Sequence, residues 1–165
     1  MEAKVNKKNI NVFTDGSCTA NGKNNAKAGI GIHFPDKDLD DISEPFILKP
    51  ITNQRAELYA IKTAIDKVIN NFEFDKLTIY SDSLYSIKCL SVWMNKWEKN
   101  NWKTANRKPV KNIDIIMPLN NILKKYKEKI VFKHVKAHTK KEDYESLCNA
   151  IADKLACKAT NIHKS

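Results

Sequence analysis

The sequence predicts an α/β fold built on one sheet of mixed strand direction. Three short apolar segments in the first third of the chain are separated by polar turns, as in consecutive hairpins. Beyond them, segments with helical spacing alternate with further strand candidates. The chain has 165 residues, which suits one domain, and its sequence shows neither an internal repeat nor a linker.

The first half of the chain predicts three strands and a helix. A polar tail, residues 1–8, precedes a single domain that we expect to span residues 9–161. The strand candidates lie at 10–15, 28–34 and 43–48. The first of them stops at Asp15, where Asp-Gly-Ser signals a turn. Asn53 is then a candidate cap for a helix with one apolar face.

The second half predicts two more strands among helices. In order, these elements are a strand at 76–81, a helix that carries Ile87, Leu90 and Trp93, a helix at 112–129, a strand at 130–135 and a helix at 144–160. Between residues 95 and 111 the composition shifts to tryptophan-bearing turns with many cations. In the last helix, the spacing predicts that Leu147, Ile151 and Leu155 face the sheet.

The chain is strongly basic. Lysine and arginine number 29 against 19 acidic residues, which gives a net charge of +10 and a pI near 9.4. Such a field attracts polyanions and speeds their capture. A basic surface that only aids solubility would have the same composition, so charge alone leaves both interpretations open.

Neither a membrane span nor a secretory signal is evident in the sequence. No apolar run approaches the roughly 20 residues that cross a bilayer, and the first ten residues are polar and basic. The four cysteines show no Cys-x-x-Cys spacing and are typical of reduced thiols rather than of disulfides or a zinc site. We therefore expect a monomeric intracellular protein, cytoplasmic or nuclear, without a membrane partner.

Four acidic residues stand in apolar settings where carboxylates are uncommon: Asp15, Glu57, Asp82 and Asp153. Bringing them together is costly, because two unit charges about 4 Å apart repel by roughly 4 kcal/mol at an effective dielectric constant near 20. A divalent cation relieves that repulsion, and Mg²⁺ and Mn²⁺ prefer hard oxygen ligands. The pattern indicates a metal-dependent phosphoryl-transfer site.

The expected positions of these acids allow them to converge. Asp15 and Asp82 each end a predicted strand, so parallel neighbours would carry both to the carboxyl edge of the sheet, where ligands bind in open α/β folds. Glu57 lies near the start of its helix, and Asp153 shares a face of the last helix with Asn149. Taken singly, each acid could instead be a turn residue, a helix cap, a first-turn residue that interacts with the helix dipole, or an ordinary surface residue. Convergence of all four favours the metal site.

Five motifs, in this order along the chain, resemble ribonuclease H of type 1. They are Phe13-Thr14-Asp15-Gly16-Ser17-Cys18, Thr52-Asn53-Gln54-Arg55-Ala56-Glu57-Leu58, Tyr80-Ser81-Asp82-Ser83, Trp102-Lys103-Thr104 and His134-Val135-Lys136-Ala137-His138. The form of the second motif, together with Asn21-Gly22, is nearer to the eukaryotic than to the bacterial branch.

The resemblance implies a ribonuclease H-like fold, with a five-stranded mixed sheet flanked by helices and a basic protrusion. It implies cleavage of the RNA strand of RNA–DNA hybrids with two Mg²⁺ ions, for which Mn²⁺ could substitute, leaving 5′-phosphate and 3′-hydroxyl ends. Asp15, Glu57, Asp82 and Asp153 match the four metal-ligand positions. His138 matches a histidine that assists proton transfer or product departure, and the charged insert 140–145 makes the segment after it longer than is usual in the family.

Substrate contacts also follow from the resemblance. The residues that match recognition of RNA 2′-hydroxyl groups are Cys18, Asn21, Asn53 and Gln54, and amides suit this task because they both donate and accept. The residues that match contacts to the DNA strand and its phosphates are Thr52, Tyr85, Trp97, Thr104 and Asn112. The basic protrusion would present Lys96, Lys99, Lys103, Arg107, Lys108 and Lys111.

Two other functions stay open from the sequence. One is a non-catalytic module that binds hybrids, and the other is a two-metal nuclease of the same fold that cuts DNA. The sequence also leaves open whether the domain comes from a larger polyprotein. Intact carboxylates favour the catalytic interpretation.

Overall fold

The computed structural model describes residues 4–137 and 139–161. Within them, one mixed sheet has the strand order β3-β2-β1-β4-β5. The strands are β1 (Val5–Thr19), β2 (Lys27–His33), β3 (Ile42–Phe46), β4 (Phe72–Ser81) and β5 (Ile130–His134). The β1–β2 and β2–β3 pairs are antiparallel, whereas β4 runs parallel to both β1 and β5. The predicted five-stranded α/β sheet of mixed direction is confirmed.

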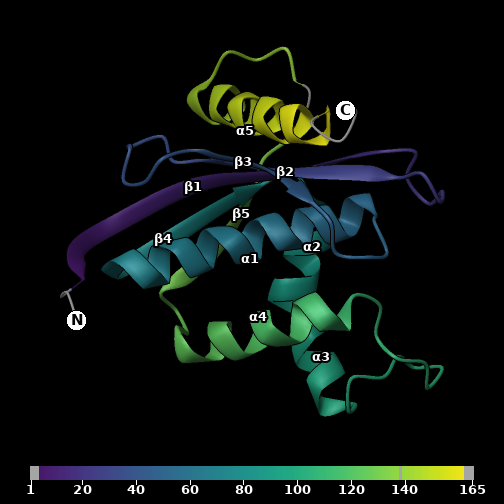
Figure 1. Ribbon diagram of the computed structural model, residues 1–165. Coiled ribbons are helices and arrows are strands. Elements are labelled where there is room, and N and C mark those ends of the chain that lie inside the picture. Colours follow the sequence, from purple (N-terminus) through teal and green to yellow (C-terminus); the bar gives the residue numbers. More distant parts are fainter. Residues whose placement is uncertain (1–3, 138, 162–165) are drawn as a thin grey trace.

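Helices cover both faces of the sheet (Figure 1). Their bounds are α1 (Asn53–Asn71), α2 (Leu84–Lys88), the π-helical segment η1 (Cys89–Trp93), α3 (Met94–Lys99), α4 (Ile113–Lys125) and α5 (Tyr144–Asn161). One face is covered by α5 and the other by α1, with α4 packed against the far side of α1 (Figure 1).

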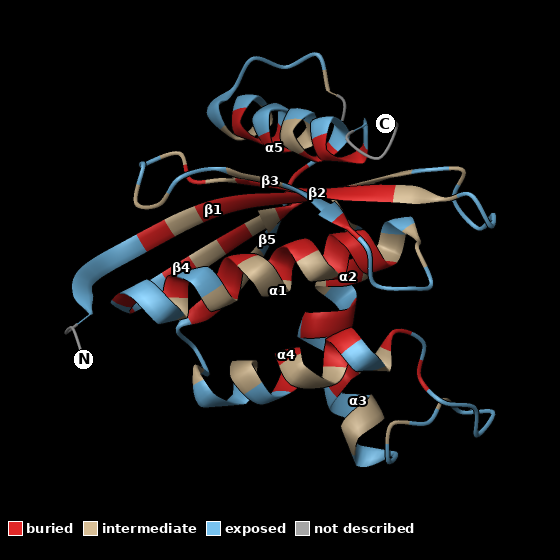
Figure 2. Ribbon diagram, viewed as in Figure 1, coloured by how far each residue is buried: buried red, intermediate tan, exposed pale blue. Residues whose placement is uncertain are grey.

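The larger part of the core lies between the sheet and α1 (Figure 2). Leu58, Ile61 and Ile65 of α1 are fully buried there, as the helical spacing predicts. Each buried side chain of this size stabilises the fold by about 1.5–3 kcal/mol. The helix is capped by Thr52, whose Oγ1 accepts a hydrogen bond from the Arg55 amide at 3.2 Å. The prediction that Asn53 is the cap is therefore wrong by one residue.

Strand β1 is longer at both ends than predicted. Val5 pairs with Phe72 of β4, so the predicted polar tail is wrong from residue 5 onward. Beyond Asp15 the strand continues to Thr19, because its other edge keeps pairing with β2. The parallel pairing of β1 with β4 nevertheless ends at Thr14 and Ser81. Asp15 and Asp82 thus follow the last parallel pair, at the expected edge.

Helix α5 turns a face of small residues to the sheet. Its buried residues are Cys148, Asn149, Ala152, Ala156, Ala159 and Thr160. Leu147 and Ile151 are 52% and 40% exposed, so the prediction that they face inward is wrong. Their bulk does not fit, because α5 lies directly on two glycines of β2: a Cβ atom on Gly29 would lie 2.6 Å from the Ala156 carbonyl oxygen, and one on Gly31 would meet the Ala152 carbonyl oxygen.

This close packing gives the first prediction. In Gly31→Ala the added methyl group meets the backbone of α5, so we expect the free energy of unfolding to fall by about 2–3 kcal/mol in urea denaturation. Gly22→Ala is the control, since nothing lies within 4 Å of its Cβ position and only its positive φ opposes the change, at about 1 kcal/mol. Equal losses in the two variants would contradict the close-packing account.

Candidate active site

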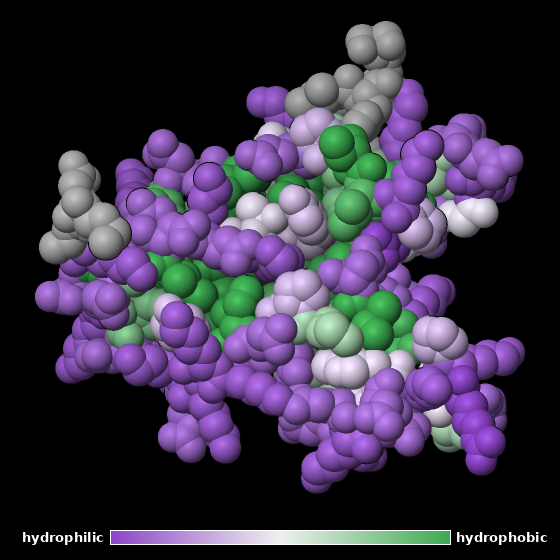
Figure 3. All heavy atoms as spheres, turned by 60° about the horizontal axis from the view of Figure 1, so that its bottom comes forward, coloured by the Kyte–Doolittle hydropathy of each residue, from purple (hydrophilic) through white to green (hydrophobic). Residues whose placement is uncertain are grey.

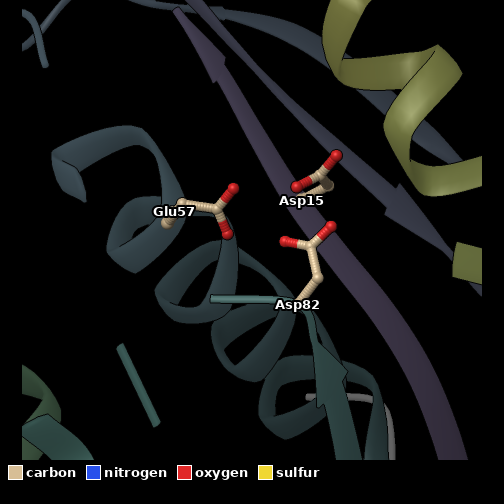
Figure 4. A group of neighbouring side chains, drawn as sticks. All are labelled: Asp15, Glu57 and Asp82. Carbon is tan, nitrogen blue, oxygen red and sulfur yellow. The ribbon is translucent and has the colours of Figure 1, made fainter. Parts of the chain in front are cut away.

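Three carboxylates meet at the edge of the sheet. Asp15 comes from β1, Glu57 from α1, and Asp82 follows β4. One oxygen of each lies within 4.8 Å of one oxygen of the other two. Figure 4 shows the three groups turned toward one another from these separate elements. The edge where the parallel strand pair ends thus collects residues that are far apart in the sequence.

Glu57 is fixed by a close approach of α1 to β1. The Gly16 amide donates a hydrogen bond to Glu57 Oε1 at 2.8 Å. Glycine is required there, because a Cβ atom on Gly16 would lie 2.5 Å from the Glu57 nitrogen. The other carboxylate oxygen, Glu57 Oε2, is buried without a partner among the described residues. An unpaired buried carboxylate oxygen needs a further donor or a cation.

Asp153 of α5 joins the other three acids in one cleft. A cleft of about 350 Å³ is lined by Asp15, Glu57, Asp82 and Asp153 together. Asn149, one turn earlier on α5, donates from Nδ2 to Asp82 Oδ2 at 3.3 Å. The sequence places Asn149 on the face of Asp153, but only the structure reveals its contact with Asp82.

Burial and crowding raise the pKa values of the two most buried acids. For Asp15, burial is the main cause of the raised pKa, followed by repulsion from Glu57 and a side-chain hydrogen bond with it; repulsion from Asp82 and a hydrogen bond with Asp153 have smaller effects. For Glu57, burial again has the largest effect and raises the pKa; hydrogen bonds from Asp15 and the Gly16 amide partly lower it, and the negative charge of Asp82 raises it. No lysine or arginine is among the described residues that line this cleft. Within the described part of the cleft, these acids are therefore not balanced by a basic side chain.

The donor set fits a hard divalent cation. The three clustered ligands are carboxylate oxygens, which suit Mg²⁺ and Mn²⁺. The unpaired Glu57 Oε2 is the second observation that supports a cation, because a buried carboxylate oxygen must be balanced either by a proton held within the cluster or by a cation.

Two of the residues expected to recognise RNA line the same cleft. Cys18 and Asn53 line it. The Asn53 amide donates to Asn21 Oδ1 at 3.1 Å, which joins the loop after β1 to the start of α1. Gln54 is half-buried in the first turn of α1. The structure therefore places Cys18 and Asn53 at the acidic cleft and Asn21 beside Asn53, while the role of Gln54 stays a prediction.

The residues expected to contact the DNA strand form a second group. Asn112 donates from Nδ2 to the Tyr85 hydroxyl at 3.0 Å. Trp97 packs against Trp93 with ring centroids 5.9 Å apart, and Thr52 caps α1. Sequence reasoning gave Arg55 no role, yet its buried side chain donates to Asn112 Oδ1 at 3.4 Å.

The predicted protrusion, residues 93–111, consists mainly of α3 and the loop after it, which extends away from the sheet (Figure 1). Its six cations are all exposed: Lys96, Lys99, Lys103, Arg107, Lys108 and Lys111. Thr104 shapes its tip, since its amide donates to the Lys108 carbonyl oxygen at 2.7 Å and its hydroxyl oxygen accepts from the Lys108 amide at 3.3 Å. Thr104 is thus placed to support the loop itself. In Figure 3, which is turned by 60° from Figure 1, the side chains over the lower part of the molecule are mostly hydrophilic.

His138 lies outside the described residues, so its predicted role stays a prediction. Its neighbour Ala137 lines the acidic cleft. A different histidine, His134 at the end of β5, has Nε2 3.3 Å from the Asp82 carbonyl oxygen. The only sequence feature that pointed to His134 is that it stands in the same motif as His138.

A mixed α/β sheet with clustered carboxylates at the end of its parallel strands defines a class of protein that can hold hard cations at that edge. The RNase H family model matches residues 7–161. The chain belongs to the RNase H family, and its curated relatives, which include a ribonuclease H1 from Rattus norvegicus, indicate type 1.

Two relatives and one solved structure illustrate the similarity. A ribonuclease H of Schizosaccharomyces pombe is 41% identical over 88% of this chain, and a probable ribonuclease H of Acanthamoeba polyphaga mimivirus is 40% identical over 82%. The chain spans only 50% and 59% of the lengths of these two proteins. The solution structure of the PFV RNase H domain has a TM-score of 0.74 and 25% identity, covering 93% of this chain and 94% of that domain. In the described part of the chain, no helix combines the length and hydrophobicity that a membrane crossing requires.

The raised pKa values predict how metal-free protein responds to pH. Because Asp15 and Glu57 bind protons more tightly when folded, ionisation above about pH 4 favours the unfolded chain. The stabilisation that the protonated Asp15 and Glu57 contribute is fully present below that pH, and it is lost as the pH rises through their pKa values in the folded state. In EDTA at pH 8, Asp15→Asn should therefore raise the free energy of unfolding by roughly 1–3 kcal/mol, with little gain at pH 4.

Chemical denaturation at the two pH values measures this difference. The exposed Asp40→Asn is the control and should show no such pH-dependent gain. Saturating Mg²⁺ should reverse the order of wild type and Asp15→Asn, because the cation stabilises only a folded cluster that it can bind. Destabilisation by Asp15→Asn in EDTA at pH 8 would refute the account of repulsion.

Proposed function

We propose that this chain is an endoribonuclease that hydrolyses the RNA strand of RNA–DNA hybrids and leaves 5′-phosphate and 3′-hydroxyl ends. The observation that carries the proposal is the convergence of Asp15, Glu57 and Asp82 in a member of the RNase H family. The relatives named ribonuclease H support the same activity. Hydrolysis of this kind requires no covalent nucleophile from the protein.

The four carboxylates are proposed to hold two Mg²⁺ ions, with Mn²⁺ as a substitute. When bound, such a pair activates water and stabilises the leaving 3′ oxygen. Asp15 would contribute to both positions, Glu57 and Asp82 to the leaving-group side, and Asp153 to the nucleophile side. The hydrogen bond from Gly16 orients Glu57, and the one from Asn149 orients Asp82. His138 is proposed to carry a proton or to assist product departure.

Recognition of RNA is proposed to rest on the side of the cleft formed by Cys18, Asn21, Asn53 and Gln54. A 2′-hydroxyl group both donates and accepts hydrogen bonds, and only RNA carries it. Asn21 and Asn53 are held together at 3.1 Å, which presents their remaining amide groups from one surface. A DNA strand in this position would leave those polar groups without partners.

The DNA strand is proposed to lie across Tyr85 and Trp97, toward the protrusion. Both aromatic side chains are half-buried and offer flat surfaces for packing against sugars. The six exposed cations beyond them would neutralise phosphates of the duplex. We further propose a monomer that acts inside the cell, which suits the four free cysteines.

The most direct test of this function is a labelled hybrid incubated with and without Mg²⁺. Asp15→Asn should bind the hybrid but lose Mg²⁺-dependent cleavage by roughly 10³-fold or more, because it removes a charge from the centre of the cluster. Exposed Asp40→Asn should cleave like wild type. A wild-type chain that binds hybrid without cutting it would instead be a non-catalytic binding module.

Substrate choice separates the proposal from a DNA nuclease of the same fold. Matched hybrid, RNA duplex and DNA duplex should be compared at equal concentration, with the ends of the products analysed. We expect cleavage only in the RNA strand of the hybrid, with 5′-phosphate products. Faster cleavage of the DNA duplex would replace the proposal by that alternative.

The protrusion should contribute mainly through phosphate charge. Replacing Lys103, Arg107 and Lys108 by glutamine should weaken hybrid binding and reduce the slope of log K against log salt by about 0.9 for each phosphate that the variant no longer neutralises. Fluorescence anisotropy at several salt concentrations measures this slope. The same replacement at exposed Lys4, Lys8 and Lys76 keeps the change in net charge equal. An equal effect of both triple variants would argue against binding of the duplex phosphates at the protrusion.

A further inference from the structure

Arg55 is a buried cation at the start of α1, only 3% exposed. Its guanidinium makes two hydrogen bonds of 2.7 Å to Asp114 at the beginning of α4. Nε and Nη2 also donate to the carbonyl oxygens of Leu48 and Lys49, at 3.5 and 3.3 Å. One side chain thus joins the loop before Thr52, helix α1 and helix α4.

Two residues that Arg55 contacts are those expected to bind a DNA phosphate. Arg55 Nη1 donates to Asn112 Oδ1, and the Arg55 amide donates to Thr52 Oγ1. Arginine has donors and no acceptor, so Asn112 must turn its oxygen toward Arg55 and its nitrogen away. Asn112 Nδ2 then donates one hydrogen to the Tyr85 hydroxyl at 3.0 Å and keeps a second hydrogen.

The consequence concerns the polarity of this surface. The Arg55 guanidinium occupies the acceptor of Asn112, and the Arg55 backbone amide occupies one acceptor site of Thr52, which leaves an N–H group and an O–H group to donate. Two donors suit an anionic oxygen. Asn112 also has a left-handed backbone, with φ of 65°, a conformation that asparagine adopts more readily than most residues.

We infer that Arg55 is a positioning residue for hybrid binding: its side chain orients Asn112 and holds the loop before Thr52, so that Thr52 and Asn112 form a pair of donors for one phosphate of the uncleaved strand. The inference rests on the proposed function for the identity of the ligand. Asp114 contributes to the same positioning, because it balances the buried positive charge of Arg55 and accepts two hydrogen bonds from its guanidinium. A lysine at position 55 would keep the charge but not the set of simultaneous contacts.

The test measures binding of a labelled hybrid in EDTA, where no cleavage occurs, for wild type, Arg55→Lys and Asp114→Asn. Asp66→Asn is the matched control, since it removes a 2.7 Å ion pair with Lys62 elsewhere on α1. Each protein is first compared with wild type by thermal unfolding. We expect the dissociation constant to rise about five- to twenty-fold in Arg55→Lys and Asp114→Asn, and to stay within twofold in Asp66→Asn.

A second hybrid, with neutral methylphosphonate linkages in its DNA strand, distinguishes positioning from general loss of structure. Wild type should bind it more weakly, and the two variants should show no further loss relative to wild type. Variants that fold and bind the normal hybrid like wild type would overturn the inference. So would an equal loss on both hybrids, or unfolding of both variants, since Arg55 would then act on the fold alone. Cleavage by wild type, assayed separately with Mg²⁺, reports on the proposed function independently of this comparison.

Discussion

Repulsion among buried carboxylates at one edge of the sheet is the constraint on which the rest of the site depends. Asp15 and Glu57 are almost fully buried, and Asp82 adds a third charge within reach of both. Without a cation, the protein relieves this repulsion by holding protons, which is why the pKa values of Asp15 and Glu57 are raised. In the proposed metal-bound form, the same clustered oxygens would serve as ligands of the cations.

The fold places these acids by close backbone packing on both faces of the sheet. Gly16 lets α1 approach β1 on one face, and Gly29 and Gly31 let α5 approach β2 on the other. Bulkier side chains would move Glu57 or Asp153 away from Asp15. Glycines at these positions therefore matter to the chemistry, although none of them is a ligand.

The sequence predicts those parts of the molecule that depend on local pattern. Alternation located the strands, helical spacing located α1, and apolar surroundings singled out Asp15, Glu57 and Asp82. The inward face of α5 could not be found this way, because leucine and isoleucine signal burial more strongly than alanine does, whereas the distance between α5 and β2 decides which of them fits.

The contacts of Arg55 depend on tertiary structure in the same manner, since Asp114 lies 59 positions away along the chain. The continuation of β1 beyond Asp15 depends on pairing with β2, which the turn signal at Asp-Gly-Ser does not reveal. Local pattern thus gives the elements, and the distances between them give the site.

A crystal structure of the chain grown with Mn²⁺ and an RNA–DNA oligonucleotide tests the central claim most directly. Anomalous scattering would locate the cations without reference to any assumed position. We expect peaks in contact with carboxylate oxygens of Asp15, Glu57 and Asp82, with Asp153 beside them. Ordered oligonucleotide with no anomalous peak in this cleft, or with these side chains dispersed, would contradict the account.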